Sequence, residues 1–225
     1  MKRPDFISLT DWRLLEQKYQ NMDYPIRRIE NGYPIQYLIG NVDFYGYKIM
    51  VNKNVLIPRF ETETLVEKTL KYIDEYEFSK ASVLEIGTGS GCISVALKIA
   101  KKNAKLNKCK ITFIKQDVNK CKLFNNYDVL ISNPPYLKET DVLDEKTRFE
   151  PHNALFGGKD GLKFYPVIFG VAKKYLNKKF LIALEIDEDN GKEIKTLAKE
   201  AFPKAKVKLE KDLTGRDRYI FVINE

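Results

Sequence analysis

The chain has 225 residues, of which 44% are hydrophobic and 31% are charged, a composition typical of a folded globular protein rather than a disordered or low-complexity chain. This length allows one substantial α/β domain with a small additional segment, but not two domains of average size. Lysine and arginine outnumber aspartate and glutamate by 39 to 31, for a net charge of +8. That surplus favours an acidic partner such as nucleic acid, or simply a soluble basic surface.

The three cysteines, Cys92, Cys109 and Cys121, form no CxxC pair and have no histidine at ligand spacing. The sequence therefore predicts neither a disulfide framework nor a metal site. Its first residues lack the apolar run of a signal peptide, and no stretch approaches the ~18 apolar residues of a membrane span. We expect a cytoplasmic protein without membrane contact.

The amino-terminal segment, residues 1–36, is expected to begin with a helix. Apolar residues recur at helical intervals, and Ser8 and Asp11 have the spacing of a weak capping box. These features predict one short helix over residues 11–21. The prolines and Gly32 that follow are typical of a loop.

A β-hairpin is predicted within residues 37–58, where apolar residues flank Tyr45 and Gly46. This hairpin would link the amino-terminal segment to the main domain. The main domain is expected to occupy residues 59–225 and to begin with a helix over residues 62–73.

The main domain then alternates strands and helices. Strands are predicted at residues 82–86, 111–115, 127–132 and 180–186, and helices at residues 92–106, 161–176 and 189–201. Two further strands, 205–211 and 219–224, are joined by a connection too short for a crossover helix, so this pair must be antiparallel. The pattern predicts an α/β fold with a mostly parallel sheet and an antiparallel last strand.

A glycine-rich turn follows the strand at residues 82–86. Gly87, Gly89 and Gly91 lead directly into a helix, which is the arrangement that places a nucleotide-like cofactor across the strand ends. Glu85 would offer a carboxylate to a cationic group of that ligand. The turn lacks the lysine of a P-loop and the spacing of the dinucleotide fingerprint. Close packing of strand and helix alone would also explain the glycines.

A second motif, Asn133-Pro134-Pro135-Tyr136, follows the apolar strand at residues 127–132. Asn133 Oδ1 and the Pro134 carbonyl would accept both protons of a planar –NH₂ group, while the Tyr136 ring stacks on it. With an electrophilic methyl sulfonium in line, this geometry favours methyl transfer to an amide or exocyclic amine through positioning and electrostatics. A rigid loop that merely ends the strand is the alternative.

With these motifs the chain resembles the class I S-adenosylmethionine-dependent methyltransferases, and more closely the HemK/PrmC-type protein-glutamine N5-methyltransferases that modify peptide chain release factors. The matching stretches are residues 34–40, 44–46, 56–63, 84–91, 132–136, 148–151, 154–161 and 212–218. The glycine turn and the Asn-Pro-Pro-Tyr motif are shared with adenine-N6 methyltransferases. The blocks at 36–63 and 148–161 are specific to the glutamine enzymes.

The resemblance implies a Rossmann-like class I methyltransferase sheet, S-adenosyl-L-methionine as cofactor and S-adenosyl-L-homocysteine as product. Asp117 would contact the adenine amino group, and Asn133 would touch both cofactor and substrate. Arg59 and Glu63 would brace the substrate channel, although an ion pair at the start of the helix explains these two residues nearly as well. The methionine and ribose part of the cofactor would be lined by Gly87, Thr88, Gly89 and Gly91, and the glutamine amide would be held by Pro134, Pro135 and Tyr136.

The same resemblance implies how the protein partner is bound. Family members bind release factors through an amino-terminal helical bundle and the hairpin, and methylate the glutamine of a Gly-Gly-Gln loop. We therefore expect a release factor as the partner, no requirement for nucleic acid, and a monomeric enzyme.

Two features depart from the family pattern. Asp117 follows Gly91 by only 26 positions (117 minus 91). In the family this interval also holds a second strand, which ends in an acidic residue that binds the ribose, and a further helix. An interval of 26 positions leaves no room for that strand and helix. Either this unit is lost or the sequence omits a stretch after Lys98, and we favour the omission because loss would cripple the cofactor site. In a competing register Asp117 itself is the ribose carboxylate. The second departure is a single predicted helix in place of the amino-terminal bundle.

Two other functions stay open at the level of sequence. A nucleic-acid adenine-N6 methyltransferase is favoured by the shared amine-holding motif and the charge of +8, although no base-reading domain is recognisable. A binding protein that keeps the fold without a cofactor is favoured by the short interval after Lys98.

Overall fold

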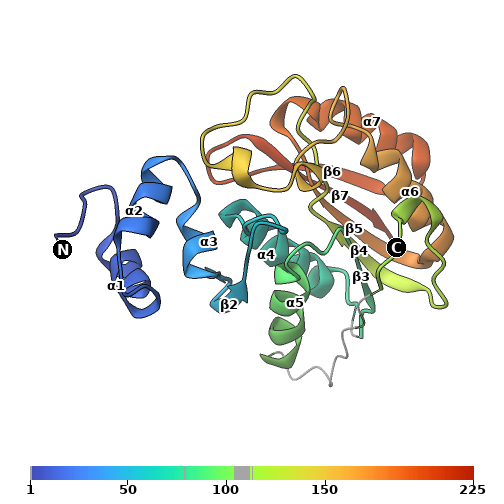
Figure 1. The fold of residues 1–225 in the computed structure, drawn as a ribbon. Coiled ribbons are helices and arrows are strands. Elements are labelled where there is room, and N and C mark those ends of the chain that lie inside the picture. Colours follow the sequence, from blue (N-terminus) through green and yellow to red (C-terminus); the bar gives the residue numbers. More distant parts are fainter. Residues whose placement is uncertain (1, 79, 104–111, 113) are drawn as a thin grey trace.

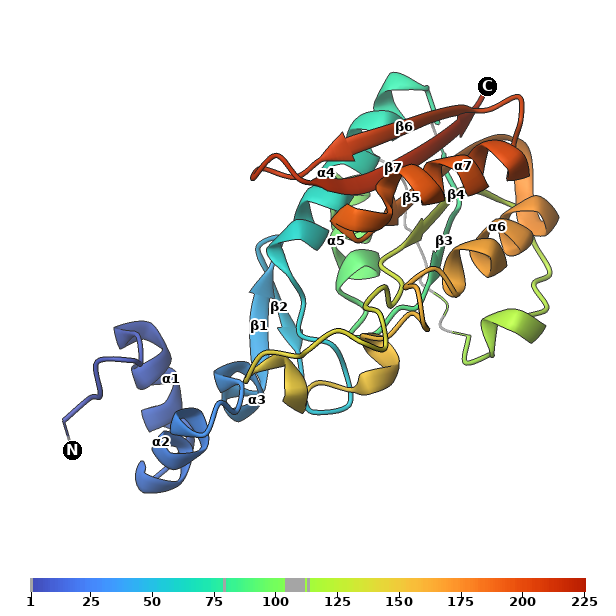
Figure 2. The same ribbon diagram turned by 90° about the horizontal axis from the view of Figure 1, so that it is seen from above.

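The computed structural model describes residues 2–78, 80–103, 112 and 114–225. Within them, the central sheet contains the strands β3 (Val83–Ile86), β4 (Tyr127–Ser132), β5 (Leu176–Glu185), β6 (Lys206–Lys211) and β7 (Asp217–Asn224). The strands lie in the order β3-β4-β5-β7-β6. Helices cover both faces of this sheet, and the amino-terminal helices extend from one side of it (Figures 1 and 2).

The sheet is parallel over its first three strands. β3 pairs with β4 and β4 with β5 in parallel register, whereas β7 runs antiparallel to both β5 and β6. Ile86 lies opposite Ser132, and Ser132 lies opposite Leu184. The carboxyl ends of the parallel strands therefore meet at one edge. The predicted α/β fold with an antiparallel last strand is confirmed.

Two apolar cores lie on the two faces of the sheet. Val129 and Ile131 of β4 join the first core, and Leu130 joins the second. Because both faces of β4 are covered, its sequence reads as a continuous apolar run. The covering helices are α4 (Phe60–Glu75) and α5 (Cys92–Asn103) on the first face and α6 (Phe164–Tyr175) and α7 (Gly191–Ala201) on the second.

The prediction of a single amino-terminal helix followed by a loop is wrong. The described residues form the helices α1 (Leu9–Lys18), α2 (Asp23–Glu30) and α3 (Ile35–Ile39). Ser8 caps α1 by accepting a hydrogen bond from the backbone N–H of Asp11 at 3.0 Å, so this helix begins earlier than predicted. Pro25 lies in the first turn of α2, where a backbone N–H has no partner within the helix and a proline is tolerated.

The predicted hairpin is confirmed. β1 (Asn41–Phe44) and β2 (Tyr47–Met50) pair antiparallel, and Phe44 lies opposite Tyr47. Tyr45 and Gly46 both have positive φ, 51° and 77°, which matches the twist of a two-residue hairpin turn. Phe44 is 1% exposed in the core beneath α4 and α5, so the hairpin is anchored to the main domain.

The strand predicted at residues 111–115 does not form at the three of these positions that the structure describes. Thr112, Ile114 and Lys115 belong to no strand, and the other two residues lie outside the described part of the chain. Ile114 is 49% exposed, so its side chain does not gain the burial that would stabilise an added strand. The end of the helix predicted for 92–106 also lies outside the described residues after Asn103.

Short 3₁₀ helices shape the loops around the sheet. They are η1 (Val118–Lys120), η2 (Thr147–Phe149), η3 (His152–Ala154) and η4 (Glu188–Asn190). Among the helices in the described part of the chain, none is long and apolar enough to cross a bilayer.

Candidate active site

A cavity of about 1080 Å³ lies at the edge where the parallel strands end. The Ser132 hydroxyl donates a hydrogen bond to the Ile86 carbonyl at 2.8 Å, which ties the end of β4 to that of β3. Open α/β sheets bind their ligands at this edge. The predicted site residues that line the cavity are Arg59, Glu85, Gly87, Thr88, Gly89, Asn133 and Pro135.

The glycine turn leaves its backbone open toward the cavity. Gly87, Gly89 and Gly91 have φ values of 72°, 50° and 79°, a left-handed conformation that glycine adopts at little cost. A Cβ atom at Gly87 would meet nothing within 4 Å, so there is free space above the turn. Gly91 does not line the cavity and instead closes the turn, because its N–H donates to the Thr88 carbonyl at 2.7 Å.

Glu85 lines this cavity, and one of its carboxylate oxygens is buried without a partner among the described residues. Its Oε2 accepts a hydrogen bond from the Ser94 hydroxyl, whereas its buried Oε1 has no hydrogen-bond partner among the described residues. Burial raises the pKa of Glu85 to about 7. An unpaired carboxylate oxygen is costly in such a place, and a cationic group of a ligand would supply its partner.

The Asn133 amide is held at the end of β4 by the first turn of α4. Its Nδ2 donates to Thr62 Oγ1 at 3.0 Å, which leaves Oδ1 as the acceptor for a ligand. Pro135 lines the cavity, whereas Pro134 is buried and does not.

Tyr136 is not among the residues that line the cavity. Its hydroxyl donates to Glu185 Oε1 at 3.2 Å, and burial, together with the Glu185 carboxylate, raises the pKa of Tyr136 well above its usual range. The sequence predicted a ring that stacks on the substrate. In the structure the phenol is neutral and its hydroxyl is used within the protein.

Arg59 lines the cavity and pairs with a buried carboxylate, Glu150, that was not predicted from the sequence. Its guanidinium forms an ion pair with Glu150, which is 4% exposed. The same carboxylate accepts a hydrogen bond from the Ile57 N–H at 2.9 Å, so the buried charge is well paired. Glu150 lies in one of the family-specific stretches, which was the available signal.

Two glycines with no predicted role support the Asn-Pro-Pro-Tyr segment. A Cβ atom at Gly157 would lie 2.5 Å from the Pro135 carbonyl oxygen, and one at Gly161 would overlap the Tyr136 carbonyl oxygen. The Gly157 N–H also donates to the Leu137 carbonyl at 2.8 Å. Close backbone contact with this segment therefore requires glycine at both positions.

Asp117 does not line the cavity. It is exposed and caps η1, where its Oδ1 accepts a hydrogen bond from the Asn119 N–H at 2.9 Å. This bond lowers the pKa of Asp117. Its neighbours Gln116 and Val118 do line the cavity, but neither predicted role of Asp117, adenine contact or ribose carboxylate, is tested by this arrangement.

Three features together define a class I methyltransferase. They are the glycine turn after the first parallel strand, the Asn-Pro-Pro-Tyr segment after the second and the antiparallel last strand. The family model described as "Methyltransferase small domain" matches residues 93–149. The same fold occurs in a crystal structure of a release factor-specific protein-(glutamine-N5) methyltransferase from Alicyclobacillus acidocaldarius, with a TM-score of 0.50. The two sequences are 24% identical, and the match covers 75% of this chain and 94% of that chain.

Curated relatives identify the family more closely. The release factor glutamine methyltransferase of Bacillus cereus is 36% identical over 233 residues, which cover 92% of this chain and 82% of the relative. That of Flavobacterium psychrophilum is 34% identical over 247 residues, which cover 99% of this chain and 86% of the relative. The chain belongs to the release factor glutamine methyltransferase family.

Membership in this family assigns S-adenosylmethionine as the cofactor, and the residues at the glycine turn fit it. The ammonium group of its methionine part is a cation of the kind that the unpaired Oε1 of Glu85 would bind. The free space above Gly87 and Gly89 admits a ligand against the backbone. Glu85, Thr88 and the turn glycines would therefore hold the methionine part.

Replacing Glu85 with glutamine should weaken cofactor binding about tenfold, because a charged hydrogen bond to the ammonium is lost. The same change should stabilise the free protein above pH 7. Burial raises the pKa of Glu85 from 4.5 to about 7, so the folded state binds its proton more tightly than the unfolded chain does. The free energy of unfolding of the wild type therefore falls as pH rises between these values, by on the order of 1–3 kcal/mol.

Calorimetric titration with cofactor and urea unfolding at pH 5 and pH 8 measure both effects. The variant should exceed the wild type in stability at pH 8 and match it more closely at pH 5. Equal stability at pH 8 together with unchanged cofactor affinity would show that Glu85 is not the unpaired carboxylate described above.

Proposed function

We propose that this chain transfers the methyl group of S-adenosylmethionine to the side-chain amide nitrogen of the glutamine in the Gly-Gly-Gln loop of peptide chain release factors. One observation carries the proposal. Asn133 lines the same cavity as the glycine turn, with its amide nitrogen bonded to Thr62, in a chain whose relatives are named release factor glutamine methyltransferases.

The nucleophile is the side-chain amide nitrogen of the substrate glutamine, which is poorly reactive by itself. The residues at this end of β4 would raise its reactivity by positioning it. The lone pair of an amide nitrogen is delocalised into its carbonyl group. Asn133 Oδ1, at the cavity, would accept a hydrogen bond from the glutamine amide and favour a pyramidal nitrogen, which frees the lone pair for attack. The bound cofactor supplies an electrophilic methyl group on a sulfonium. The residues at the end of β4 would hold the amide nitrogen in line with that methyl group; transfer would leave the cofactor as S-adenosyl-L-homocysteine and release one amide proton to solvent.

Arg59 and Glu150 serve the substrate peptide in this proposal. Because Glu150 fixes the Arg59 guanidinium at the cavity, its remaining N–H groups are placed to donate to backbone carbonyls of the Gly-Gly-Gln loop. We also propose that the enzyme acts as a monomer. We place the reaction in the cytoplasm, where translation supplies the release factor.

The direct test combines the protein with S-adenosylmethionine labelled in the methyl group and a purified release factor. Transfer is expected to the wild-type factor and not to a variant in which the glutamine of the Gly-Gly-Gln loop is alanine. Equal labelling of both factors would contradict the proposal. DNA and RNA oligonucleotides assayed in parallel test the adenine alternative, and calorimetry with the cofactor tests the alternative of a binding protein without one.

A further inference from the structure

The Asn133 side chain can act as the proposed acceptor in only one of its two amide orientations. With Oδ1 toward the cavity it accepts an N–H of the substrate amide. Turned by 180° it would present its own N–H₂ donors to the substrate N–H₂, and no hydrogen bond would form. Something in the protein must therefore select the first orientation.

Thr62 is the residue that contacts this amide. It is 2% exposed in the first turn of α4, and its Oγ1 accepts the hydrogen bond from Asn133 Nδ2 at 3.0 Å. A threonine hydroxyl has one proton to donate and lone pairs to accept with. It donates that proton to Glu185 Oε2 at 2.7 Å, and so it can only accept from Asn133.

The Glu185 carboxylate sets the direction of these two hydrogen bonds. It is the last residue of β5, 1% exposed, and the parallel register of β4 and β5 brings it beside Asn133. An ionised carboxylate only accepts hydrogen bonds. Glu185 accepts one from Thr62 and one from Tyr136, the latter at 3.2 Å. In the series of hydrogen bonds from Asn133 through Thr62 to Glu185, each donor therefore points toward the Glu185 carboxylate.

We infer that Thr62 and Glu185 are positioning residues that hold the Asn133 amide with Oδ1 toward the substrate. The inference rests on the proposed function, because it explains how the acceptor for the glutamine amide is oriented. Neither residue touches the reacting atoms. Glu185 orients Asn133 through Thr62, and it also holds the Asn-Pro-Pro-Tyr segment through its hydrogen bond with the Tyr136 hydroxyl.

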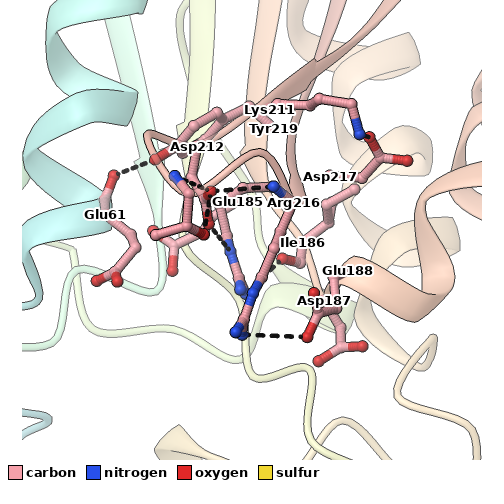
Figure 3. Close-up of polar contacts among 12 residues, drawn as sticks. Glu61, Glu185, Ile186, Asp187, Glu188, Lys211, Asp212, Arg216, Asp217 and Tyr219 are labelled. Carbon is pink, nitrogen blue, oxygen red and sulfur yellow. Dashed lines mark hydrogen bonds and ion pairs between the residues drawn. The ribbon is translucent and has the colours of Figure 1, made fainter.

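Further polar contacts lie near Glu185. Figure 3 shows it between the start of α4 and the side chains of the β6–β7 connection. The Tyr219 hydroxyl donates to the Glu61 carbonyl at 2.8 Å, which links α4 to β7. Across the connection, Lys211 pairs with Asp217 and Arg216 with Glu188.

Protonation of Glu185 would reverse the direction of the hydrogen bonds. Burial raises the pKa of Glu185 to about 7, opposed by its hydrogen bonds from Thr62 and Tyr136 and by the Arg218 charge. A protonated Glu185 donates to Thr62, whose own proton then turns toward Asn133 and favours the flipped amide. The titratable and charged groups that act on Glu185 are Glu61, Tyr136, Tyr165, Arg218 and Tyr219.

The first experiment removes the Thr62 hydroxyl. Thr62→Val keeps the side-chain shape and should lower kcat for methylation of the release factor by roughly 10- to 100-fold, because a displaced acceptor is costly to the reaction. The KM for S-adenosylmethionine should stay the same. Thr62→Ser restores the hydroxyl and should recover kcat to within about threefold of wild type.

Thr69→Val is the matched control on the same helix. Thr69 is 0% exposed, and its hydroxyl donates to the Leu65 carbonyl within α4. This variant should keep the kcat of the wild type. An equal loss of kcat in both valine variants would overturn the positioning role and point to damage of α4.

The second experiment measures kcat against pH. In the wild type kcat should fall as pH decreases through about 7, where Glu185 takes up its proton. Glu185→Gln keeps the size of the side chain but can donate to Thr62 at every pH. Its kcat should be low and should lack this transition. A transition of unchanged midpoint in the variant would exclude Glu185 as its source.

A measurement without turnover separates this inference from the proposed function. Nuclear magnetic resonance of the Asn133 side-chain amide, assigned by the loss of its signal in Asn133→Asp, reports the hydrogen bond of Nδ2. The amide protons should be protected from exchange in the wild type and in Thr69→Val, and unprotected in Thr62→Val. Unprotected protons in the wild type would refute the inference even if the enzyme methylates its release factor. Protection with no methylation would support the inference and refute the proposed function.

Discussion

Replacing Asn133 with alanine should lower kcat/KM for the release factor by on the order of 10²- to 10³-fold, the range seen when one preorganised polar contact is removed from a transition state. In the proposed function the amide oxygen of Asn133, a residue that lines the cavity at the end of β4, is the acceptor for the substrate amide. Without it the substrate nitrogen keeps its planar, delocalised form. The loss should appear mainly in kcat, because the acceptor is most effective when the nitrogen becomes pyramidal.

Steady-state kinetics with the release factor, together with cofactor titration by calorimetry, measures this effect. Asn126→Ala is a matched control, because Asn126 is exposed just before the same strand and does not line the cavity. It should leave kcat/KM unchanged. A variant at Asn133 that retains more than a tenth of the wild-type kcat would contradict the role of Asn133 as the acceptor for the amide.

The parts of the site that were predictable from sequence are those built from consecutive residues. The glycine turn lies between a strand and a helix, and a local pattern of apolar and small residues is enough to indicate both. The same holds for Asn133, which directly follows the run of β4. Residues of both motifs line one cavity, because a parallel sheet brings the ends of its strands to one edge.

The supporting contacts were not predictable because they join distant parts of the chain. Thr62 and Glu185 are separated by 123 positions, and Arg59 and Glu150 by 91. Their contacts depend on the register of β4 with β5 and on where α4 begins relative to the sheet. Local periodicity specifies neither. The contact between the Tyr136 hydroxyl and Glu185, 49 positions away, was likewise not predictable, and the stacking of the Tyr136 ring on the substrate stays a prediction.

Two element predictions failed because a local signal has more than one meaning. Pro25 was interpreted as part of a loop, although a proline in the first turn of a helix breaks no hydrogen bond. The apolar residues within 111–115 indicated a strand, but a strand also needs a neighbour to pair with and a surface to cover it. Ile114 has no such cover, since it is 49% exposed.

Gly161→Ala should have the other large effect on activity, with kcat about 100-fold lower, through the backbone of the Asn-Pro-Pro-Tyr segment. Gly161 has a φ of 78°, and a Cβ atom there would overlap the Tyr136 carbonyl oxygen and lie 2.9 Å from Asn190 Nδ2. The Tyr136 backbone must then move away. That movement displaces Asn133, three residues earlier, from the acceptor position.

Gly215→Ala separates this displacement from backbone strain. Gly215 has a similar φ of 86°, but a Cβ atom there would meet nothing within 4 Å. Positive φ alone should cost each variant about 1 kcal/mol of the free energy of unfolding. The overlap at Gly161 should add roughly 1–3 kcal/mol more. Urea unfolding and kcat measured on both variants check the two contributions.

The comparison decides what the Phe156–Gly161 stretch does. If kcat falls only in Gly161→Ala, the glycine is required for contact with the backbone of Tyr136. If both variants lose activity in proportion to their loss of stability, the stretch is merely a folded loop and the support of the Asn-Pro-Pro-Tyr segment must come from elsewhere. We expect the first result, because the Leu137 N–H donates to the Leu155 carbonyl at 2.9 Å and holds the two segments together, so the strain cannot relax by separating them.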